Sequence, residues 1–397
     1  MNDSLHSLGS GRARWSRVWS LVLIGLVGVL VAGCSGGAGG QQSAPPPPPT
    51  VLFDPGNGAQ GVSPTAPITA TAQHGRIVDA VLTNPEGERV EAAVAPDGAS
   101  WSAAEPLGYG KTYKAAITVQ GAAGAPVTQE SSFSTVDPAD QTYVSMNPLD
   151  GQTVGVGQPL AFYFSEDAPA PDKAKAEQAI RIRTEPAVEG AFYWIDSREV
   201  HWRPKEYWQP GTEITVDADV YGKDLGNGVW GEENRTATFH IGDAVVLKAD
   251  GASHQMSINV NGVEQRTIPV SLGKPSFPSN DGTHVVTEHH ATKLMDSSTY
   301  GLPVDQGGYQ TEVKWAVRIS NSGEFLHAAP WSVADQGKRN VSHGCINMSN
   351  ADAKAVYDLL KKGDVVEITN SGGPELKSTN GFGDWQVPWD EWLSGNR

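Results

Sequence analysis

Apolar and polar residues alternate along most of this chain, in short runs separated by turn residues. Residues 113–119 form one such run, and Pro-Glu-Gly at 85–87 and Pro-Asp-Gly at 96–98 are turn sequences. Side chains two positions apart in a β-strand share a face, so this alternation predicts half-buried strands joined by polar turns. Because no helical period interrupts the pattern, residues 51–140 are expected to form a β-sandwich.

The following segment, residues 141–243, repeats this plan in the same order. The matching stretches contain a turn, a Trp followed by a strand, and a Phe at the end of a strand: 55–62 with 148–156, 101–113 with 202–214, and 133–137 with 239–243. Repeats in a fixed order predict a duplicated β-sandwich, with a short helix inserted over residues 173–180. A recurring Trp is more typical of a core than of a carbohydrate-stacking surface, so Trp101 and Trp202 are expected to be buried.

From residue 244 to residue 370 the strands lengthen and Asn-Gly and Asp-Gly turns separate them, which predicts a third, β-rich domain. Residues 291–312 are polar and contain several glycines, so we expect a long functional loop there. One helix is predicted after Ser349, which forms an approximate capping box with Asp352. The apolar positions of this helix follow the spacing i, i+3, i+4, i+7: Ala353, Val356, Tyr357 and Leu360.

The N-terminal residues show a different pattern. Three arginines precede an apolar run over residues 18–31, which is short for a transmembrane helix. The run ends in Leu-Val-Ala-Gly-Cys at Cys34, which resembles a bacterial lipobox. We expect residues 1–33 to be a lipoprotein signal peptide, Cys34 to carry a lipid, and residues 34–50 to be a Gly/Pro-rich linker. An uncleaved anchor is the alternative. Both place the folded chain outside the cytoplasm, held at the outer face of the plasma membrane and reaching into the cell wall.

Charge and cysteine content exclude some classes of function. The chain has 29 Lys and Arg against 45 Asp and Glu, a net charge of −16. Nucleic acid needs a basic face, so no nucleic-acid partner is expected. A disulfide between the two cysteines, Cys34 and Cys345, is the less favoured interpretation, because each cysteine has a local explanation of its own.

Candidate chemistry centres on Cys345, which stands in the sequence Ser-His-Gly-Cys-Ile-Asn. A cysteine attacks as a thiolate, so it needs a base or a positive field. His343, two positions away, can share a face with the thiol, and His327 could pair with it across two strands. Gly344 removes side-chain bulk and frees backbone N–H groups for an oxyanion, and Asn347 could donate an amide hydrogen bond.

On these residues alone, two other interpretations stay open. Cys345 could be a buried structural cysteine. Five histidines could suggest zinc: His284, His289, His290, His327 and His343. HxxxH and CxxC spacings are absent and a single thiolate is an incomplete ligand set, so we expect no metal. His289 and His290 are expected in a loop or at the surface.

The motif has a wider context. His327, a gap and then Ser-His-Gly-Cys-Ile-Asn at 342–347 resemble the signature of the YkuD-type L,D-transpeptidase catalytic domain. Further stretches resemble the actinobacterial branch of that family: 295–301, 308–309, 327–332 and 383–389. The resemblance implies a mainly β fold, with two immunoglobulin-like sandwiches, a YkuD-type β-rich catalytic domain with one clear helix, and a Trp-rich extension over residues 371–397.

The resemblance also implies a reaction. Cys345 would attack a peptidoglycan tetrapeptide stem at its third residue, release D-alanine and form a thioester, which an amine of a neighbouring stem resolves to a 3→3 cross-link. His327 would be the general base, oriented by a backbone carbonyl at Ala328, a position where close relatives have Ser. His343 would support the site. Carbapenem β-lactams would acylate Cys345, and neither cofactor nor metal is needed.

The remaining site residues follow from the same resemblance. Ser342, Gly344 and Asn347 would shape the substrate and oxyanion region. Four residues would lie at the entrance or on its flap: Tyr300, Tyr309, Trp331 and Met295. A cysteine carboxypeptidase or endopeptidase, which hydrolyses the same thioester, is the alternative function, and an inactive wall-binding adaptor is a third possibility.

The C-terminal extension carries three tryptophans, Trp385, Trp389 and Trp392. Three exposed indoles would be a liability for a soluble domain. We expect them to pack against the third domain or the second sandwich; a sugar-binding role is the alternative.

Overall fold

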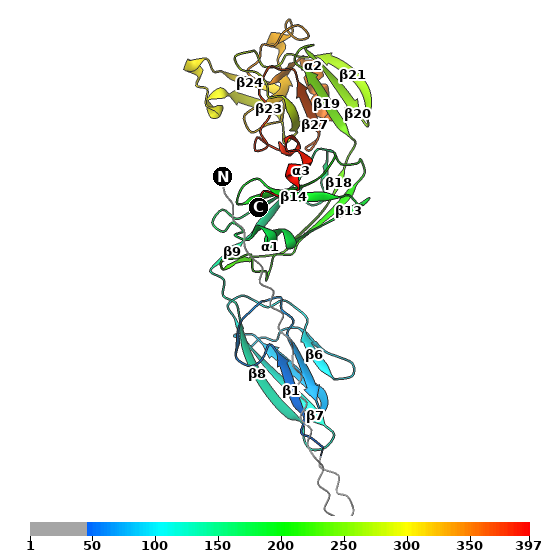
Figure 1. Ribbon diagram of the computed structural model, residues 1–397, viewed down its shortest axis with the longest axis vertical. Helices are drawn as coiled ribbons and strands as arrows, with labels where there is room; N and C mark the ends of the chain where they lie inside the picture. The colour runs from blue at the N-terminus through cyan, green and yellow to red at the C-terminus, as the bar shows by residue number, and fades with distance from the viewer. Residues whose placement is uncertain (1–45) are drawn as a thin grey trace, which may run out of the picture. The chain divides into compact units, whose positions relative to one another are not determined.

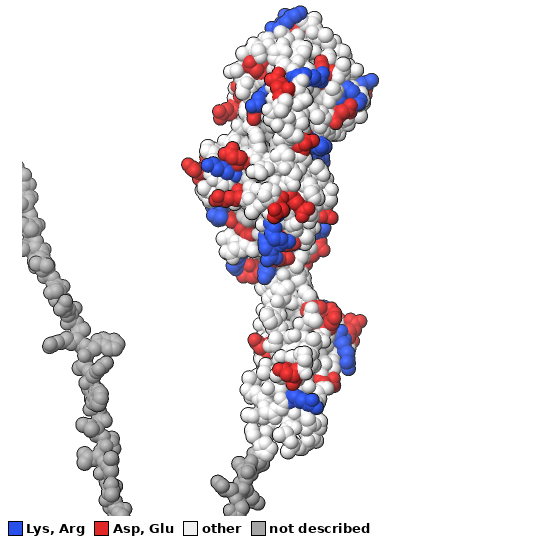
Figure 2. Space-filling model, turned by 90° about the vertical axis from the view of Figure 1, so that its right-hand side faces the viewer, with Lys and Arg blue, Asp and Glu red and all other residues white. Residues whose placement is uncertain are grey.

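The computed structural model describes residues 46–397 (Figure 1). The predicted signal peptide and Cys34 lie outside the described residues. Within residues 46–397 no helix has the length and apolar character needed to cross a membrane. On the face drawn in Figure 2, acidic and basic side chains are interspersed, so this face has no continuous basic surface.

The first sandwich consists of two four-stranded sheets that enclose an apolar core. One sheet has the spatial order β1 (Thr50–Asp54), β3 (Thr69–Gln73), β6 (Ser100–Ala103), β5 (Ala92–Val94). The other has the order β2 (Ala59–Val62), β8 (Val127–Thr135), β7 (Thr112–Gly121), β4 (Gly75–Thr83). In β7 alternate residues are buried, as the period-two pattern predicts.

The second sandwich is built in the same way. Its sheets have the orders β10 (Val144–Asn147), β12 (Leu160–Phe164), β15 (Glu199–Pro204), β14 (Gly190–Trp194), and β11 (Thr153–Val154), β18 (Arg235–Ile241), β16 (Glu213–Ala218), β13 (Ile180–Glu185). The predicted short helix is α1 (Lys173–Gln178), capped by Asp172. A small parallel pair, β9 (Asp140–Thr142) with β17 (Val229–Gly231), completes this part.

The two sandwiches share one strand order, which supports the predicted duplication. In each, the first strand pairs with the third and the third with the sixth, and the second strand runs parallel to the last. Trp101 and Trp202 lie on the equivalent strands β6 and β15 and are 2% and 7% exposed. Both are core residues, as predicted.

The third domain packs a five-stranded sheet against a four-stranded sheet. The first has the order β21 (Val263–Pro269), β20 (Gln255–Val260), β19 (Val245–Asp250), β27 (Val365–Thr369), β22 (Gly282–Val285). The second has the order β23 (Glu288–Asp296), β24 (Gln310–Arg318), β25 (Phe325–Ala328), β26 (Ile346–Met348). A shared apolar core joins residues of both sheets and of the following helix. This second sheet positions the site.

The predicted helix is α2 (Asn350–Leu359). Ser349 is its N-cap, and the Ser349 hydroxyl accepts a hydrogen bond from the Asp352 N–H. Ala353, Val356 and Leu360 are buried in the domain core, as the helical spacing predicts.

The predicted long loop over residues 291–312 is wrong. Strand β23 continues to Asp296 and β24 begins at Gln310, so the two form a hairpin with regular antiparallel pairing. Only the tip is irregular, with the 3₁₀ turns η1 (Ser297–Tyr300) and η2 (Val304–Gln306). One face of the hairpin is exposed and carries polar residues, so the sequence of these strands resembles that of a polar loop. His289 and His290 accordingly lie on β23 and not in a loop.

The C-terminal extension packs back onto the second sandwich through its tryptophans, as predicted. It contains the 3₁₀ turn η4 (Asp384–Gln386) and the short helix α3 (Trp389–Trp392). The Trp385 indole N–H donates to the Gly157 carbonyl and that of Trp392 to the Ala191 carbonyl, each at 2.8 Å.

Candidate active site

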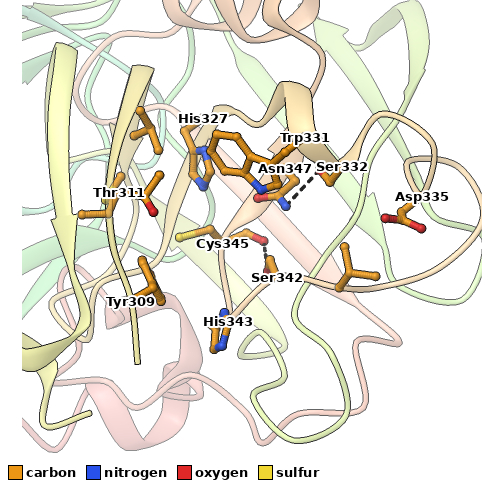
Figure 3. Close-up of a pocket in the computed structure, with 13 residues that line it drawn as sticks. Tyr309, Thr311, His327, Trp331, Ser332, Asp335, Ser342, His343, Cys345 and Asn347 are labelled. Carbon is orange, nitrogen blue, oxygen red and sulfur yellow. Dashed lines mark hydrogen bonds between the residues drawn. The ribbon is translucent and has the colours of Figure 1, made fainter. Parts of the chain in front are cut away.

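The site is assembled where β25 and β26 run side by side. Their parallel register places His327 opposite Asn347, with Cys345 immediately before β26. The side chains of His327 and Cys345 both face one pocket of about 240 Å³ (Figure 3). Thirteen residues line it: Met295, Tyr309, Thr311, Val313, His327, Trp331, Ser332, Asp335, Val341, Ser342, His343, Cys345 and Asn347.

Cys345 is a buried free thiol at the base of this pocket, 3% exposed. Its Sγ lies 3.7 Å from the Gly323 carbonyl oxygen. Burial raises the pKa of Cys345 to about 12; the Phe325 N–H opposes this shift and the Glu324 carboxylate adds to it. The resting residue is therefore a thiol, and it must lose its proton at the moment of attack.

His327 is poised as a neutral base. Its Nδ1 lies 2.9 Å from the Ala328 carbonyl oxygen. A carbonyl can only accept, so Nδ1 carries the proton and Nε2 is left unprotonated. Burial lowers the pKa of His327, which favours the neutral ring. The backbone carbonyl at Ala328 thus orients the ring as the resemblance implies, and no hydroxyl is required.

Ser342 and Gly344 shape the loop that presents the thiol. The Ser342 hydroxyl donates to the Cys345 carbonyl at 2.6 Å and accepts from the Gly344 N–H at 3.1 Å. Gly344 has φ of +118°, and a Cβ there would have room, with Glu324 Cγ 3.7 Å away. The glycine is needed for its backbone conformation more than for space. Its N–H is bonded within the loop and is not free for an oxyanion.

Asn347 is held by a wall that the sequence did not indicate. Its amide donates to the Ser332 hydroxyl at 3.2 Å, and Ser332 donates to the Ala329 carbonyl at 3.0 Å. The Gln336 amide donates to the same hydroxyl at 3.2 Å. Asn347 therefore acts first as a brace for the pocket wall. Ser332 ends the stretch 327–332 that carries the resemblance, but no role was predicted for it, and Gln336 has no motif spacing that could have revealed it.

His343 is tied to the other side of the loop and not to the thiol. The Lys274 ammonium lies 2.9 Å from His343 Nε2, so that nitrogen accepts. The ring packs between Phe277 and Tyr309, with both centroid distances 5.0 Å. Burial and the Lys274 charge lower the pKa of His343. This placement agrees with a supporting role. Lys274, remote in sequence, was not predicted.

The entrance residues occupy two sides of the pocket. Tyr309 and the 58% exposed Trp331 line it, and the Trp331 ring lies 6.2 Å from that of His327. Met295 is buried in a small apolar cluster with Cys345 and Phe325. Tyr300 belongs to η1 at the hairpin tip; its side chain is not among those described.

Comparison with known proteins identifies the family. Residues 244–368 match the L,D-transpeptidase catalytic domain and residues 59–224 match the bacterial Ig domain. L,D-transpeptidase 2 of Mycobacterium tuberculosis (strain CDC 1551 / Oshkosh) is 45% identical over 341 residues, which are 86% of this chain and 83% of that protein. L,D-transpeptidase 5 of M. tuberculosis (strain ATCC 25618 / H37Rv) is 36% identical over 351 residues, 87% of this chain and 76% of that protein.

A solved structure gives the same result. An LD transpeptidase in complex with imipenem is 37% identical and covers 57% of this chain and 97% of that chain, with a TM-score of 0.50. With relatives alike over most of their length and a thiol and imidazole meeting in its pocket, the protein belongs to the L,D-transpeptidase family and is an L,D-transpeptidase enzyme with bacterial Ig-like sandwiches ahead of its catalytic domain.

Proposed function

We propose that the protein forms 3→3 cross-links in peptidoglycan through a thioester on Cys345, with release of D-alanine. The observation that carries the proposal is the fixed tautomer of His327. The Ala328 carbonyl holds the Nδ1 proton, which leaves Nε2 as the only proton acceptor of that ring in a pocket shared with a buried thiol.

Acylation needs one proton transfer in each direction. His327 Nε2 takes the Cys345 proton while Sγ attacks the carbonyl carbon of the third stem residue. The imidazolium then gives this proton to the departing D-alanine amine as the C–N bond breaks. The products are a thioester on Cys345, free D-alanine and neutral His327.

Deacylation repeats the sequence with a second stem. The side-chain amine of its third residue attacks the thioester carbonyl and loses a proton to His327 Nε2. The thiolate of Cys345 leaves and recovers the proton. Because burial raises the pKa of the Cys345 thiol, its loss of a proton to His327 is coupled to its attack in the acylation half of the reaction.

Two further expectations belong to this proposal. A relative is known in complex with imipenem, and we propose that carbapenems acylate Cys345 here. We also propose that a lipid at Cys34 tethers the enzyme to the outer face of the plasma membrane. The lipobox-like residues 30–34 support this anchor, and the proline-rich residues 45–49 would serve as its spacer.

Mass spectrometry with a disaccharide-tetrapeptide tests the reaction. The expected product is a cross-linked dimer that has lost one D-alanine, and Cys345→Ala should abolish it. Release of tripeptide without dimer would overturn the proposal in favour of a hydrolase, since water and an amine compete for the same thioester. Dimer formation by Cys345→Ala would contradict the mechanism itself.

A further inference from the structure

Glu324 is a buried carboxylate that acts on Cys345 but does not line the substrate pocket. Glu324 is 5% exposed, and it immediately precedes β25. Its two neighbours in the chain touch the sulfur: the Gly323 carbonyl lies 3.7 Å from Sγ, and the Phe325 N–H favours the thiolate. The reaction described above makes no use of this acid.

Glu324 has partners on β22 and on the segment before it. Its Oε1 accepts from the Asn280 N–H at 2.7 Å. With the Asn280 amide nitrogen turned toward the carboxylate, it donates to both Glu324 oxygens at 3.2 Å. Oε2 lies 3.5 Å from Nε2 of His284, a fully buried histidine. Burying an isolated charge is costly, and these partners offset that cost for the Glu324 carboxylate.

The segment before β22 also binds the loop at residues 342–345, which carries Cys345. The Ser279 hydroxyl donates to the Gly344 carbonyl at 2.7 Å and accepts from the Gly273 N–H at 3.1 Å. The Glu324 side chain lies beneath Gly344, with its Cγ 3.7 Å from where a Cβ would stand. Glu324 therefore connects the strand that carries His327 with the loop that carries Cys345.

Charge gives this arrangement a second effect. A fixed negative charge beside a thiol disfavours the thiolate. The titratable groups that line the pocket with Cys345 are His327, His343 with its Lys274 partner, Tyr309 and Asp335. Of these, His327 is the neutral base that takes up the proton. Glu324, which lies outside the pocket lining with Oε2 toward His284, disfavours the thiolate before that transfer.

We propose that Glu324 is a positioning residue for the nucleophile: from the buried side it fixes both main-chain segments that flank the sulfur, and its charge keeps Cys345 a thiol until His327 accepts the proton. A thiol is far less reactive than a thiolate toward oxidants and electrophiles. The proposal rests on the proposed function only in taking Cys345 as the nucleophile.

The pH dependence of Cys345 alkylation by iodoacetamide tests this role in the full chain. Peptide mapping by mass spectrometry separates Cys345 from Cys34. Glu324→Gln should move the midpoint to lower pH by about one unit, which is about a tenfold faster alkylation at a fixed pH below the midpoint. Glu324→Asp, which keeps the charge, should move it back toward the wild-type value.

Glu312→Gln is the matched control. Glu312 is exposed on β24, on the face opposite Thr311 and Val313 of the pocket, and the substitution removes the same charge. It should leave the midpoint unchanged. If folded Glu324→Gln keeps the wild-type midpoint, or if the control shifts equally, the proposal fails.

If Glu324→Gln does not fold, Glu324→Met removes the charge at similar volume, and the same shift is required of it. Peroxide oxidation of Cys345 provides an independent measurement. A tenfold larger thiolate fraction should make Cys345 of the Glu324→Gln or Glu324→Met variant oxidise about tenfold faster at pH 7. Alkylation and oxidation need no transpeptidation. A protein that cross-links nothing would sink the proposed function and leave this result intact.

Discussion

At the residue scale, Gly344 shows how a single torsion governs the nucleophile. Its φ of +118° turns the chain so that the Gly344 carbonyl meets Ser279 while the Gly344 N–H meets Ser342. Both bonds lie next to Cys345, so the direction of the thiol depends on a conformation that L side chains rarely adopt.

We predict that Gly344→Ala costs about 1–3 kcal/mol of unfolding free energy through backbone strain, and that it slows acylation of Cys345 by a carbapenem at least about tenfold. Gly262→Ala is the control. Gly262, with φ of +79°, lies in the open turn between β20 and β21, so its replacement should cost stability and leave acylation unchanged. Equal acylation by both variants would show that the torsion does not orient the thiol.

The sequence alone identified the reacting residues, but it did not identify the residues that support them, such as Lys274 and Glu324. Cys345 and His327 belong to a motif whose spacing reflects the chemistry, and His327 then meets the Ala328 carbonyl because any residue supplies one. Lys274 and Glu324 reach the site from loops that are joined only by folding. A single Lys or Glu in such a loop resembles a solvated surface residue in the sequence. Only the folded structure shows that Glu324 is buried and that Lys274 contacts His343.

At the element scale, the helix α2 supports the sheet that carries the base. Ala353 and Val356 contribute to the same core as Leu326 and Ala328 of β25, the strand of His327. Ser349 is the N-cap of this helix, and its hydroxyl accepts a hydrogen bond from the Asp352 N–H.

Ser349→Ala should weaken the start of this helix by about 1 kcal/mol, the usual value of an N-cap. We expect amide hydrogen exchange in the first turn of α2 to accelerate about fivefold, with smaller effects elsewhere. Ser145→Ala, at an exposed position of β10, should leave exchange in α2 unchanged. Uniform exchange rates in α2 across the variant and the wild type would refute the role of the cap.

The hairpin of β23 and β24 shows what an element-level prediction misses. Polar residues such as Gln310 and Glu312 made the segment resemble a loop, but in β24 they are exposed and alternate with half-buried Thr311 and buried Val313. A strand that has one solvent-exposed face and glycines near its end shows only a weak alternation of apolar and polar residues. The duplicated sandwiches were easier to predict, because two weak patterns in the same order reinforce each other.

At the scale of the whole molecule, the second sandwich and the C-terminal extension share a buried ionic cluster. His201 of β15 lies 2.6 Å from Asp384 of η4 through Nδ1 and 2.7 Å from Glu199 through Nε2. Burial opposes protonation of this ring, but Asp384 and Glu199 outweigh it and raise the pKa of His201 to about 9. A buried imidazolium therefore links two parts of the chain that are remote in sequence.

This link predicts a pH-dependent stability. A raised pKa means that the contribution of His201 is fully present below about pH 6.5, the unfolded value, and is lost as pH rises through about 9. The free energy of unfolding of the wild type should fall across this window by up to about 3 kcal/mol more than that of His201→Gln.

The control is His240→Gln on β18, in the other sheet of the same sandwich, where the histidine pairs with Glu213 at 3.1 Å but is half exposed. Its urea unfolding profile should follow that of the wild type from pH 6 to pH 10. If His201→Gln runs parallel to the wild type instead, the cluster does not carry the charge that its geometry indicates.

The packing of the extension also sets an order of maturation. Arg397 pairs with Glu177 of α1, a side chain that is mostly buried, and the Asn396 amide donates to the Trp194 carbonyl. These residues leave the ribosome more than 150 positions after β18, the last strand of the sandwich they complete (396 − 241 = 155). Until they arrive, Glu177 is a buried acid without its cation. The second sandwich thus reaches its final form only after the catalytic domain has been synthesised.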